Sequence, residues 1–453
     1  MVTRAATGRQ PEAPAGSPWT LLFLFAASAL LVGAVGVDNA VSVAVVLVNL
    51  VFIVFLARHV MFAAAARWAV TDLEEATDLH EEYRPRVSVL VACHNEELVA
   101  RSLVRGLTEL EYPRDRLEVF LVDDNSTDGT AELLEELAAP HSFIHVLHRE
   151  PGAEGGKSGA LNAARERVTG EIVVVFDADH VPAPDSVHRL VRHFRDPEVG
   201  AVQGRCVVRN PDDSPLARAV AIDYLSGYLV NEYGRQALFE LPAYGGANCA
   251  VRASTLRSLG GWNVDSVTED TDLTLRVVLA GERVRYDVTA VDTEQAPVTL
   301  GRFWRQRYRW ARGHQQVWRD MHRDVWRTNQ LGFAEKVEST LFLLVYHVPV
   351  ASFVGIMLLL ARLGGIGHRI TLFETLPLAA LLFAGPFCEL ASGLLIARTR
   401  RSLVWTLLWM LPIFAVSILV CTKAWLDGEI GKPYRWVKTQ RSDADLVVEG
   451  VPT

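Results

Sequence analysis

The chain contains 453 residues, half of them hydrophobic, and carries a formal net charge of −8. That hydrophobic share exceeds what an ordinary soluble protein shows and predicts membrane segments, while the length leaves room for two or three domains. The negative charge argues against a general nucleic-acid partner. The five cysteines are scattered and form no CxxC pair, so they indicate a reduced cytosolic environment and no zinc site.

Two apolar runs, Trp19–Val37 and Val41–Leu56, follow residues 1–18, which we expect to be disordered. Each run is close to the roughly 20 residues needed to cross a bilayer. Two adjacent runs without a convincing small-residue cleavage site favour a transmembrane hairpin over residues 19–62 rather than a cleaved signal peptide.

Three further apolar runs lie within residues 339–425, namely Ser339–Ala361, Ile370–Ala397 and Leu403–Trp425. Basic residues follow the second and the fourth of the five runs. The positive-inside rule then places the domain between the second and third runs in the cytoplasm of a multi-pass inner (plasma) membrane protein. Five crossings, however, would put the tail of residues 426–453 outside, although basic residues gather between 432 and 441. Either one run lies in the interface or re-enters the membrane, or the Gly385-Pro386 break divides its run into two short pieces. The sequence leaves these solutions open.

The segment between the two groups of runs, residues 72–300, alternates between strand and helix patterns. Three apolar runs have a strand pattern: Val87–Ala92, Glu118–Val122 and Glu171–Phe176. A helical pattern covers Glu96–Leu110, and another helix is expected to open at Ser126–Asp128. Strands that alternate with helices indicate an α/β domain with a mostly parallel sheet. Ligands of such sheets collect at the carboxyl ends of the strands.

Acidic and amide side chains stand where three of these strands end. Asn95-Glu96, Asp123-Asp124 and Asp177-Ala178-Asp179 each follow an apolar run. In an extended chain alternate side chains share one face, so Asp177 and Asp179 can approach the same cation. A single Asp-x-Asp is more often a solvated turn, but the agreement of three strand ends predicts a site for a nucleotide and a divalent ion. Hard oxygen ligands favour Mg²⁺ or Mn²⁺ over zinc.

Six short motifs occur in a fixed order along the chain. They are Val91–Glu97 (VACHNEE), Val122–Thr130 (VDDNSTDGT), Gly156–Asn162 (GKSGALN), Phe176–Asp179 (FDAD), Thr268–Asp270 (TED) and Gln306–Trp310 (QRYRW). The series resembles the processive, inverting family 2 glycosyltransferases, among them the cellulose, hyaluronan, chitin and poly-N-acetylglucosamine synthases. The resemblance covers about residues 87–315. It implies a GT-A-type, Rossmann-like, mostly parallel sheet flanked by transmembrane helices.

The resemblance also implies roles on the donor side. Asp177 and Asp179 would hold the metal ion, which offsets the charge of the departing nucleoside diphosphate as a Lewis acid. The other residues implied to bind the nucleotide sugar are Asn95, Glu96, Asp123, Asp124 and Lys157. For Lys157, an ordinary position at a helix start is the alternative.

The acceptor hydroxyl must lose a proton when it attacks the sugar, and this requires a general base. In the related enzymes the base is the aspartate of the Thr-Glu-Asp motif, which is Asp270 here. Glu269 and Asp272 lie too near in sequence to be excluded. The alternative is that Thr268 and its neighbours merely cap the following helix, and capping and catalysis can hold together.

Residues 301–335 are rich in arginine and tryptophan, which is typical of an amphipathic helix at a membrane interface. The resemblance gives this segment a second role, in which Gln306, Arg309 and Trp310 close the acceptor side of the site. The tryptophan would stack beneath the terminal sugar while the arginine assists the diphosphate. An interfacial helix can do both.

Two further segments bear on the acceptor and the tail. Gly245–Cys249 stands where relatives carry a glycine-containing acceptor loop, but it differs from the cellulose synthase version and leaves the acceptor sugar open. The basic segment Trp436–Arg441 resembles a gating loop of some synthases, and that role requires a cytoplasmic tail.

The sequence therefore predicts a membrane-embedded glycosyltransferase that adds sugars from a UDP-sugar to a growing β-linked polysaccharide with inversion and passes the product across the membrane. The compact layout of the apolar runs resembles poly-N-acetylglucosamine and chitooligosaccharide synthases more than cellulose synthases. This resemblance implies UDP-N-acetylglucosamine as the donor, with UDP-glucose as the nearest rival. The bilayer and a small accessory membrane subunit are the other expected partners. The alternatives are a non-processive transferase acting on a lipid carrier and an inactive membrane scaffold.

Overall fold

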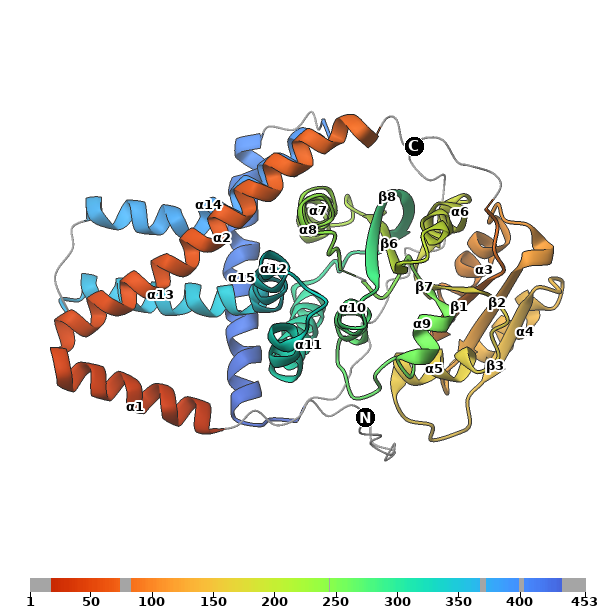
Figure 1. Cartoon of the computed structure of the whole chain (residues 1–453), viewed down its shortest axis with the longest axis horizontal. Coiled ribbons are helices and arrows are strands. Elements are labelled where there is room, and N and C mark those ends of the chain that lie inside the picture. Colours follow the sequence, from red (N-terminus) through yellow and green to blue (C-terminus); the bar gives the residue numbers. More distant parts are fainter. Residues whose placement is uncertain (1–17, 74–82, 244, 367–371, 399–402, 434–453) are drawn as a thin grey trace.

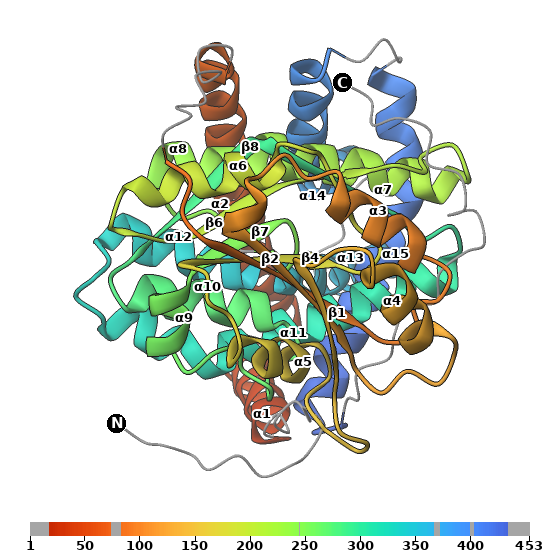
Figure 2. The ribbon, with the colours of Figure 1, turned by 90° about the vertical axis from the view of Figure 1, so that its right-hand side faces the viewer.

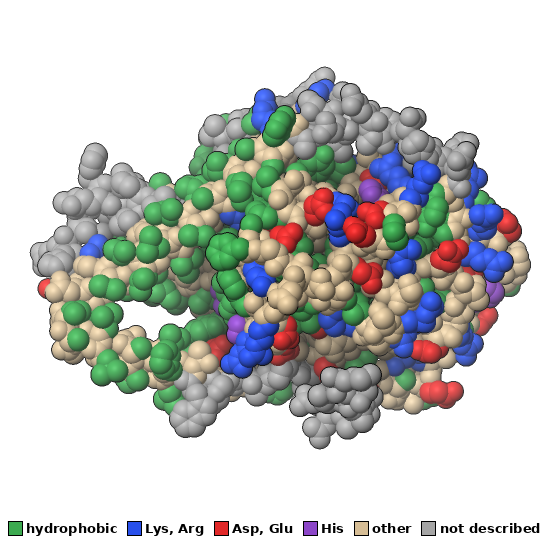
Figure 3. Space-filling model, viewed as in Figure 1, with side chains coloured by type: hydrophobic (Ala, Val, Ile, Leu, Met, Phe, Trp, Pro, Cys, Tyr) green, Lys and Arg blue, Asp and Glu red, His purple; other side chains and the backbone are tan. Residues whose placement is uncertain are grey.

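The computed structural model describes residues 18–73, 83–243, 245–366, 372–398 and 403–433. Residues 1–17 of the segment expected to be disordered and the basic segment Trp436–Arg441 therefore lie outside the described residues, while Pro18, the last residue of the first segment, begins a helix. Figure 1 shows an α/β domain on one side and long apolar helices extending away from it on the other. Hydrophobic side chains cover the helical part of the surface, whereas charged side chains gather on the α/β domain (Figure 3).

An eight-stranded sheet forms the centre of the α/β domain, with the strand order β3-β2-β1-β4-β7-β6-β8-β5. Four neighbouring strands are parallel, and Val87 of β1 pairs with Leu117 of β2 and Ile172 of β4. The strands are β1 (Val87–Cys93), β2 (Leu117–Asp123), β3 (Ile144–His148), β4 (Ile172–Asp177), β5 (Val181–Pro182), β6 (Val199–Val208), β7 (Cys249–Arg252) and β8 (Arg283–Glu294). Strand β7 runs antiparallel to β4 and β6, and β5 to β8. The predicted α/β class with a mostly parallel sheet is confirmed.

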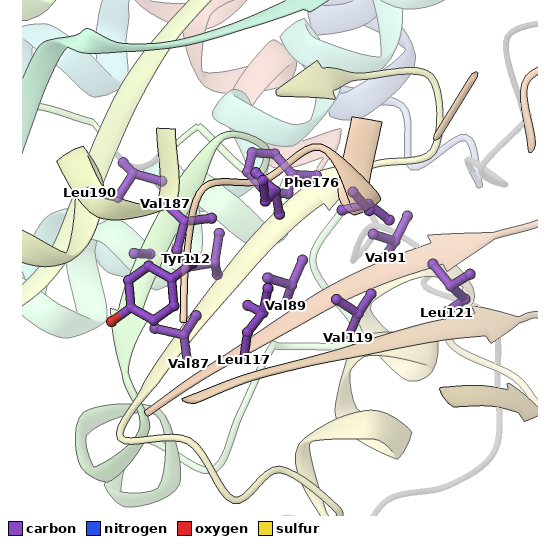
Figure 4. Close-up of a cluster of buried hydrophobic side chains, with 14 of the residues drawn as sticks. Val87, Val89, Val91, Tyr112, Leu117, Val119, Leu121, Phe176, Val187 and Leu190 are labelled. Carbon is purple, nitrogen blue, oxygen red and sulfur yellow. The ribbon is translucent and has the colours of Figure 1, made fainter. Parts of the chain in front are cut away.

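Both faces of the sheet are covered, which is why its strands read as continuous apolar runs. On one face Val89 and Val119 pack beneath α3 (Ala100–Thr108), α4 (Thr130–Ala138) and α6 (Ser186–Val191), as Figure 4 shows in part. On the other face Leu90 and Phe120 pack against α5, α9 and α10. These helices span Gly156–Arg165, Ala253–Ser258 and Glu269–Leu279.

Two predicted helices begin later than the sequence pattern indicated. Helix α3 begins at Ala100 rather than Glu96, and α4 begins at Thr130 rather than at Ser126–Asp128. In both cases an asparagine just after the strand has a positive φ, 55° at Asn95 and 56° at Asn125. Because that conformation interrupts a helix, the acidic strand ends are followed by loops. These loops form part of the site described below.

The remaining helices either pack on the α/β domain, as the seventh, eighth and eleventh do, or form the apolar region. They are α1 (Pro18–Val35), α2 (Val37–Leu73), α7 (Pro215–Ser226), a π-helix (Gly227–Glu232), α8 (Tyr233–Phe239), α11 (Leu300–Arg327), α12 (Phe333–Leu344), α13 (Val348–Leu363), α14 (Leu372–Ile396) and α15 (Leu403–Glu429). By length and composition, three described segments could cross a membrane: Val37–Trp68, Phe333–Leu363 and Leu408–Glu429. Two shorter apolar helices, Thr20–Val35 and Phe383–Ile396, accompany them. The first two helices are separated at Gly36, whose φ is 82°.

A buried cluster of charges joins the apolar helices to the α/β domain. Glu338 of α12 accepts hydrogen bonds from Arg58 of α2, at 2.7 and 2.9 Å, and from Arg235 of α8, at 3.1 Å. All three side chains are at most 4% exposed. Since a buried charge is costly unless paired, this contact fixes α2 against α8 and α12.

We expect the core under α6 to depend on Phe194, whose side chain is 2% exposed. Phe194→Ala should lower the free energy of unfolding by about 3–5 kcal/mol, because it removes buried apolar area and leaves a cavity. Thermal unfolding in detergent measures this as a lower Tm. The control Leu98→Ala, at a site that is 46% exposed, should stay within about 0.5 kcal/mol of the parent. Equal Tm values for the two variants would contradict this view of the core.

Candidate active site

One cavity of about 550 Å³ lies between the carboxyl ends of the parallel strands and the apolar helices. Most of the residues predicted from the sequence line it: Glu96, Asp124, Lys157, Asp177, Asp179, Asp270, Gln306, Arg309 and Trp310. Asn95 and Asp123 do not line it. The fold thus brings together residues from both halves of the domain.

Asn95 and Asp123 hold the loops around the cavity instead. The Asn95 side-chain oxygen accepts a hydrogen bond from the Thr127 N–H at 2.7 Å, and Asp123 accepts one from the Ser126 N–H at 3.2 Å. Asp124 is the member of its pair that faces the cavity, where it forms a short ion pair with Arg149. Burial raises the pKa of Asp124, although Arg149 opposes that shift.

The two aspartates of the Asp-x-Asp pair lie at and just beyond the end of β4. Ligand atoms of Asp177, Asp179 and His180 lie within 4.8 Å of one another, so their geometry suits a single cation. His180, however, is already held by other acids, with a short contact to Asp292 and a 2.9 Å contact to Glu294. Burial lowers the pKa of His180, but these carboxylates outweigh it and hold the pKa well above 6.5. The two aspartate carboxylates are therefore the better donors for a hard divalent ion.

Lys157 lies between two groups of acidic residues that line the cavity. It is the second residue of α5, as a helix-start lysine would be, but its amine points into the cavity. Its Nζ lies 2.5 Å from Asp177 Oδ1 and 3.4 Å from Glu269 Oε1, and it donates to the Gly246 carbonyl at 2.9 Å. Burial lowers the pKa of Lys157, but Asp177 and Glu269 more than offset this effect and raise it. The amine is thus held as a cation among acids.

Asp270 lies in the first turn of α10. Burial and the negative charge of Glu269 raise the pKa of Asp270 to about 6, against the hydrogen bond that its Oδ1 accepts from the Thr271 N–H at 2.6 Å. Gly246 lies directly against this carboxylate, and a Cβ there would be 3.0 Å from Asp270 Oδ2. The φ of Gly246 is +76°, so both the space and the backbone favour glycine.

The other two acids near Asp270, Glu269 and Asp272, each lie beside a basic side chain. Asp272 is buried, pairs with Arg276 at 2.5 Å and does not line the cavity. Glu269 lines the cavity but lies beside Lys157. Thr268 precedes the helix without a side-chain cap hydrogen bond, so the capping alternative rests only on the acids of the first turn.

Helix α11 forms one wall of the cavity. The Trp310 ring lies 6.3 Å from the Tyr224 ring, and the Arg307 guanidinium lies 4.7 Å from the Trp310 ring centroid. Gln306 Oε1 is buried and, among the described residues, has no hydrogen-bond partner. A Cβ on Gly313 would lie 2.2 Å from Thr268, so the Thr-Glu-Asp loop packs directly on this helix.

The cavity extends to the apolar helices, which the sequence patterns did not reveal. Arg58 of α2, Asn231 of the π-helix and Glu389 of α14 also line it. Asn231 donates a hydrogen bond to Glu389 at 2.6 Å. Arg58 is one of the basic residues that follow the second apolar run, and Glu389 lies within the fourth. The available signal was the ionisable residue within such a run, which often marks a functional site.

Residues 85–313 match the family model described as "Glycosyltransferase like family 2". A beta-monoglucosyldiacylglycerol synthase from Nostoc sp. is 32% identical over 370 residues, which cover 78% of this chain and 76% of the relative. The chain therefore belongs to glycosyltransferase family 2 and is a glycosyltransferase.

Other relatives match a shorter part of the chain. The probable glycosyltransferase YdaM of Bacillus subtilis is 39% identical over 235 residues, which cover 51% of this chain and 56% of YdaM. A poly-beta-1,6-N-acetyl-D-glucosamine synthase of Staphylococcus epidermidis is 30% identical over 243 residues, 53% of this chain and 57% of that protein. The alignments thus span little more than half the length of these two relatives.

Among solved structures, the mannosyltransferase PcManGT of Pyrobaculum calidifontis, in complex with GDP-Man and Mn²⁺, is similar with a TM-score of 0.57. The sequences are 26% identical, and the match covers 84% of this chain and 99% of that one. This likeness agrees with the GT-A fold.

Proposed function

We propose that this protein transfers a sugar from a UDP-sugar, with inversion, to an acceptor held at the membrane end of the cavity. One observation carries the proposal. A single cavity is lined by the strand-end carboxylates Asp177 and Asp179, by Asp270, and by Trp310 together with residues of the apolar helices. The residues proposed to bind the donor, to act as the base and to bind the acceptor thus line one cavity.

On the donor side, Asp177 and Asp179 would hold Mg²⁺ or Mn²⁺. Bound there, the ion would offset the charge that develops on the leaving diphosphate. Asp124, Glu96 and Lys157 face the cavity and would contact the nucleotide sugar. Asp123 and Asn95 would act through the loops that they hold.

Asp270 would act as the general base. It takes the proton from the acceptor hydroxyl while the oxygen forms a bond to the anomeric carbon and the bond to the diphosphate breaks on the opposite face. A carboxylate whose pKa is near 6 is ionised at neutral pH yet more basic than an exposed aspartate, which suits this role. Lys157 balances Glu269, so the negative charge beside the base is held in place.

For the acceptor, we propose a growing β-linked polysaccharide, with UDP-N-acetylglucosamine as the donor and UDP-glucose as the rival. The Gln306–Trp310 segment on the cavity wall supports this proposal, as does similarity to the poly-N-acetylglucosamine synthase of S. epidermidis. Gln306 and Arg309 would help to bind the acceptor end and the diphosphate. The α/β domain would lie at the cytoplasmic face of a plasma membrane, and the product would cross the bilayer.

A lipid acceptor is the second candidate. The Nostoc relative, named as a glycolipid synthase, aligns over 78% of this chain, more than the 85–313 family segment alone. Membranes given radiolabelled UDP-N-acetylglucosamine or UDP-glucose distinguish the two. Label in a polymer that a linkage-specific hydrolase digests supports the first proposal, and label in chloroform-extractable glycolipid supports the second. No transfer and no UDP release would contradict both.

Asp179→Asn should weaken metal-dependent UDP binding and reduce turnover at least about a hundredfold, roughly 2.7 kcal/mol of transition-state stabilisation. An amide is a weaker ligand than a carboxylate for a hard cation. Calorimetry with UDP and Mn²⁺ on the detergent-solubilised protein measures the first effect. Asp212→Asn, whose side chain is 77% exposed, is the control and should bind as the parent does. Unchanged Mn²⁺-dependent UDP affinity in Asp179→Asn would remove the metal role.

Asp270→Asn should keep UDP affinity while kcat falls by about 10² to 10⁴, because the amide cannot accept the proton. In the parent, protonation of a base whose pKa is about 6 should lower kcat about tenfold per pH unit below that value. This acid limb should be absent in the variant. Asp272→Asn serves as the comparison: we expect it to lower Tm through loss of the Arg276 pair and to retain the acid limb. Near-parental kcat in Asp270→Asn would transfer the role to another group.

Trp310→Ala should leave UDP binding intact but shorten the product and raise the share of donor that is hydrolysed. An aromatic face holds a sugar ring through apolar contact without fixing every hydroxyl, so its loss releases the growing chain. Product sizing by mass spectrometry, together with UDP release, measures the outcome. Trp304→Ala, on the same helix but outside the cavity lining, is the control. An unchanged length distribution would show that Trp310 is only an interfacial anchor.

A further inference from the structure

Helix α15 has the composition of a membrane span, yet it begins against the α/β domain. Leu408–Glu429 is long and apolar enough to cross a bilayer. Near its start, the Trp409 indole N–H donates a hydrogen bond to the Pro215 carbonyl, at the first residue of α7, at 3.4 Å. Met410 is fully buried in a cluster with Ala219 and Ile222 of α7. The first turns of α15 therefore lie beside α7.

The other end of α15 also contacts the α/β domain. The Tyr308 hydroxyl donates to Asp427 Oδ2 at 2.6 Å, and Arg319 pairs with Glu429 at 3.6 Å. Arg312, which is 1% exposed, donates to the Lys432 carbonyl at 2.9 Å. These partners lie on α11, the helix that carries Gln306 and Trp310.

A helix that crosses a bilayer must place its two ends at opposite faces. At about 1.5 Å per residue, the 27 residues of α15 extend roughly 40 Å, more than the hydrocarbon thickness of about 30 Å. Both ends nevertheless contact elements of one domain, and α11, with charged residues along most of its length, is too polar to be a membrane span. In Figure 1, the axis of α15 runs crosswise to the axes of α13 and α14. In Figure 2, where the α/β domain faces the viewer, α15 is seen from its side rather than along its axis.

The side of α15 that faces away from the domain is an apolar stripe. Its exposed members recur every three or four residues, as one face of a helix requires: Trp405, Leu408, Trp409, Pro412, Ala415, Leu419, Leu426 and Ile430. The exposed charge within the stripe, Lys423, pairs with Asp427 at 2.7 Å. Tryptophans near the start of the stripe suit the headgroup level of a bilayer.

We propose that α15 lies in the membrane interface, with this stripe against lipid, and does not cross the bilayer. The bilayer is the partner that the neighbouring apolar helices already require. With α1, α2, α13 and α14 as the crossing helices, the chain returns to the starting side after α14. Residues after Glu429 then lie on the same side as the α/β domain. An odd number of spans would place the basic tail outside. In this arrangement α15 is the apolar run that lies in the interface, so the number of spans is even and that conflict is resolved.

Labelling of introduced cysteines tests the side of each segment in the full-length protein. The three variants are Lys432→Cys after α15, Arg101→Cys on the α/β domain and Ile366→Cys beyond α13, at sites that are 56%, 62% and 55% exposed. Sealed proteoliposomes are treated with a membrane-impermeant maleimide, normalised to labelling in detergent and to the parent with its native cysteines. We expect the labelled fraction of Lys432→Cys to equal that of Arg101→Cys, with the complementary fraction for Ile366→Cys. Equality of Lys432→Cys with Ile366→Cys would overturn the proposal.

Depth measurements test the orientation of the helix independently. Nitroxide labels on Leu408→Cys, Ala415→Cys and Leu426→Cys report accessibility to oxygen and to a nickel chelate. An interfacial helix should give three similar depths at the headgroup boundary, whereas a crossing helix should place the central label much deeper than both ends. The second result would overturn the proposal. UDP release by each variant serves as the folding control, since none of these positions lines the cavity.

Discussion

The concentration of negative charge in one cavity is the constraint on which the rest of the structure depends. Asp177 and Asp179 approach from the sheet, while Glu269 and Asp270 approach from the start of α10. Lys157 lies between the two groups and contacts a carboxylate of each. Its hydrogen bond to Gly246 adds the loop before β7, so a single amine ties three separate elements together. Without that countercharge, like charges at this separation would repel one another.

Helix α11 connects the acidic cluster to the apolar helices. Gly313 packs on Thr268 beside the acids of α10, while Tyr308 and Arg312 on the same helix hold the end of α15. Helix α11 is therefore held between the Thr268–Asp270 segment and the end of α15. A second link, the buried contact of Glu338 with Arg58 and Arg235, holds α2 against the domain. Arg58 and Arg235 of the second link also line the cavity.

The two ends of the cavity are built from different parts of the chain. One end consists of strand ends and the loops that follow them, whereas the membrane end consists of residues of α2, the π-helix and α14. Asn231 and Glu389 make that end polar despite its apolar surroundings. Under the proposed function, changes at this end would alter the acceptor without disturbing the carboxylates, since function depends on sites placed on a common fold.

Local patterns in the sequence predicted three of the eight described strands, the acids at their ends and the apolar helices, because strand and helix periodicity depends on neighbouring residues. Most of the site residues predicted from the ordered motifs, including Asp270 and Trp310, line the cavity. Tertiary structure decided which acid of each pair faces the cavity: Asp124 does, whereas Asp123 holds a loop and Asp272 pairs with Arg276. It also brought Arg58 and Glu389 to the same cavity. Those outcomes depend on contacts between elements far apart in the chain, which no local periodicity encodes.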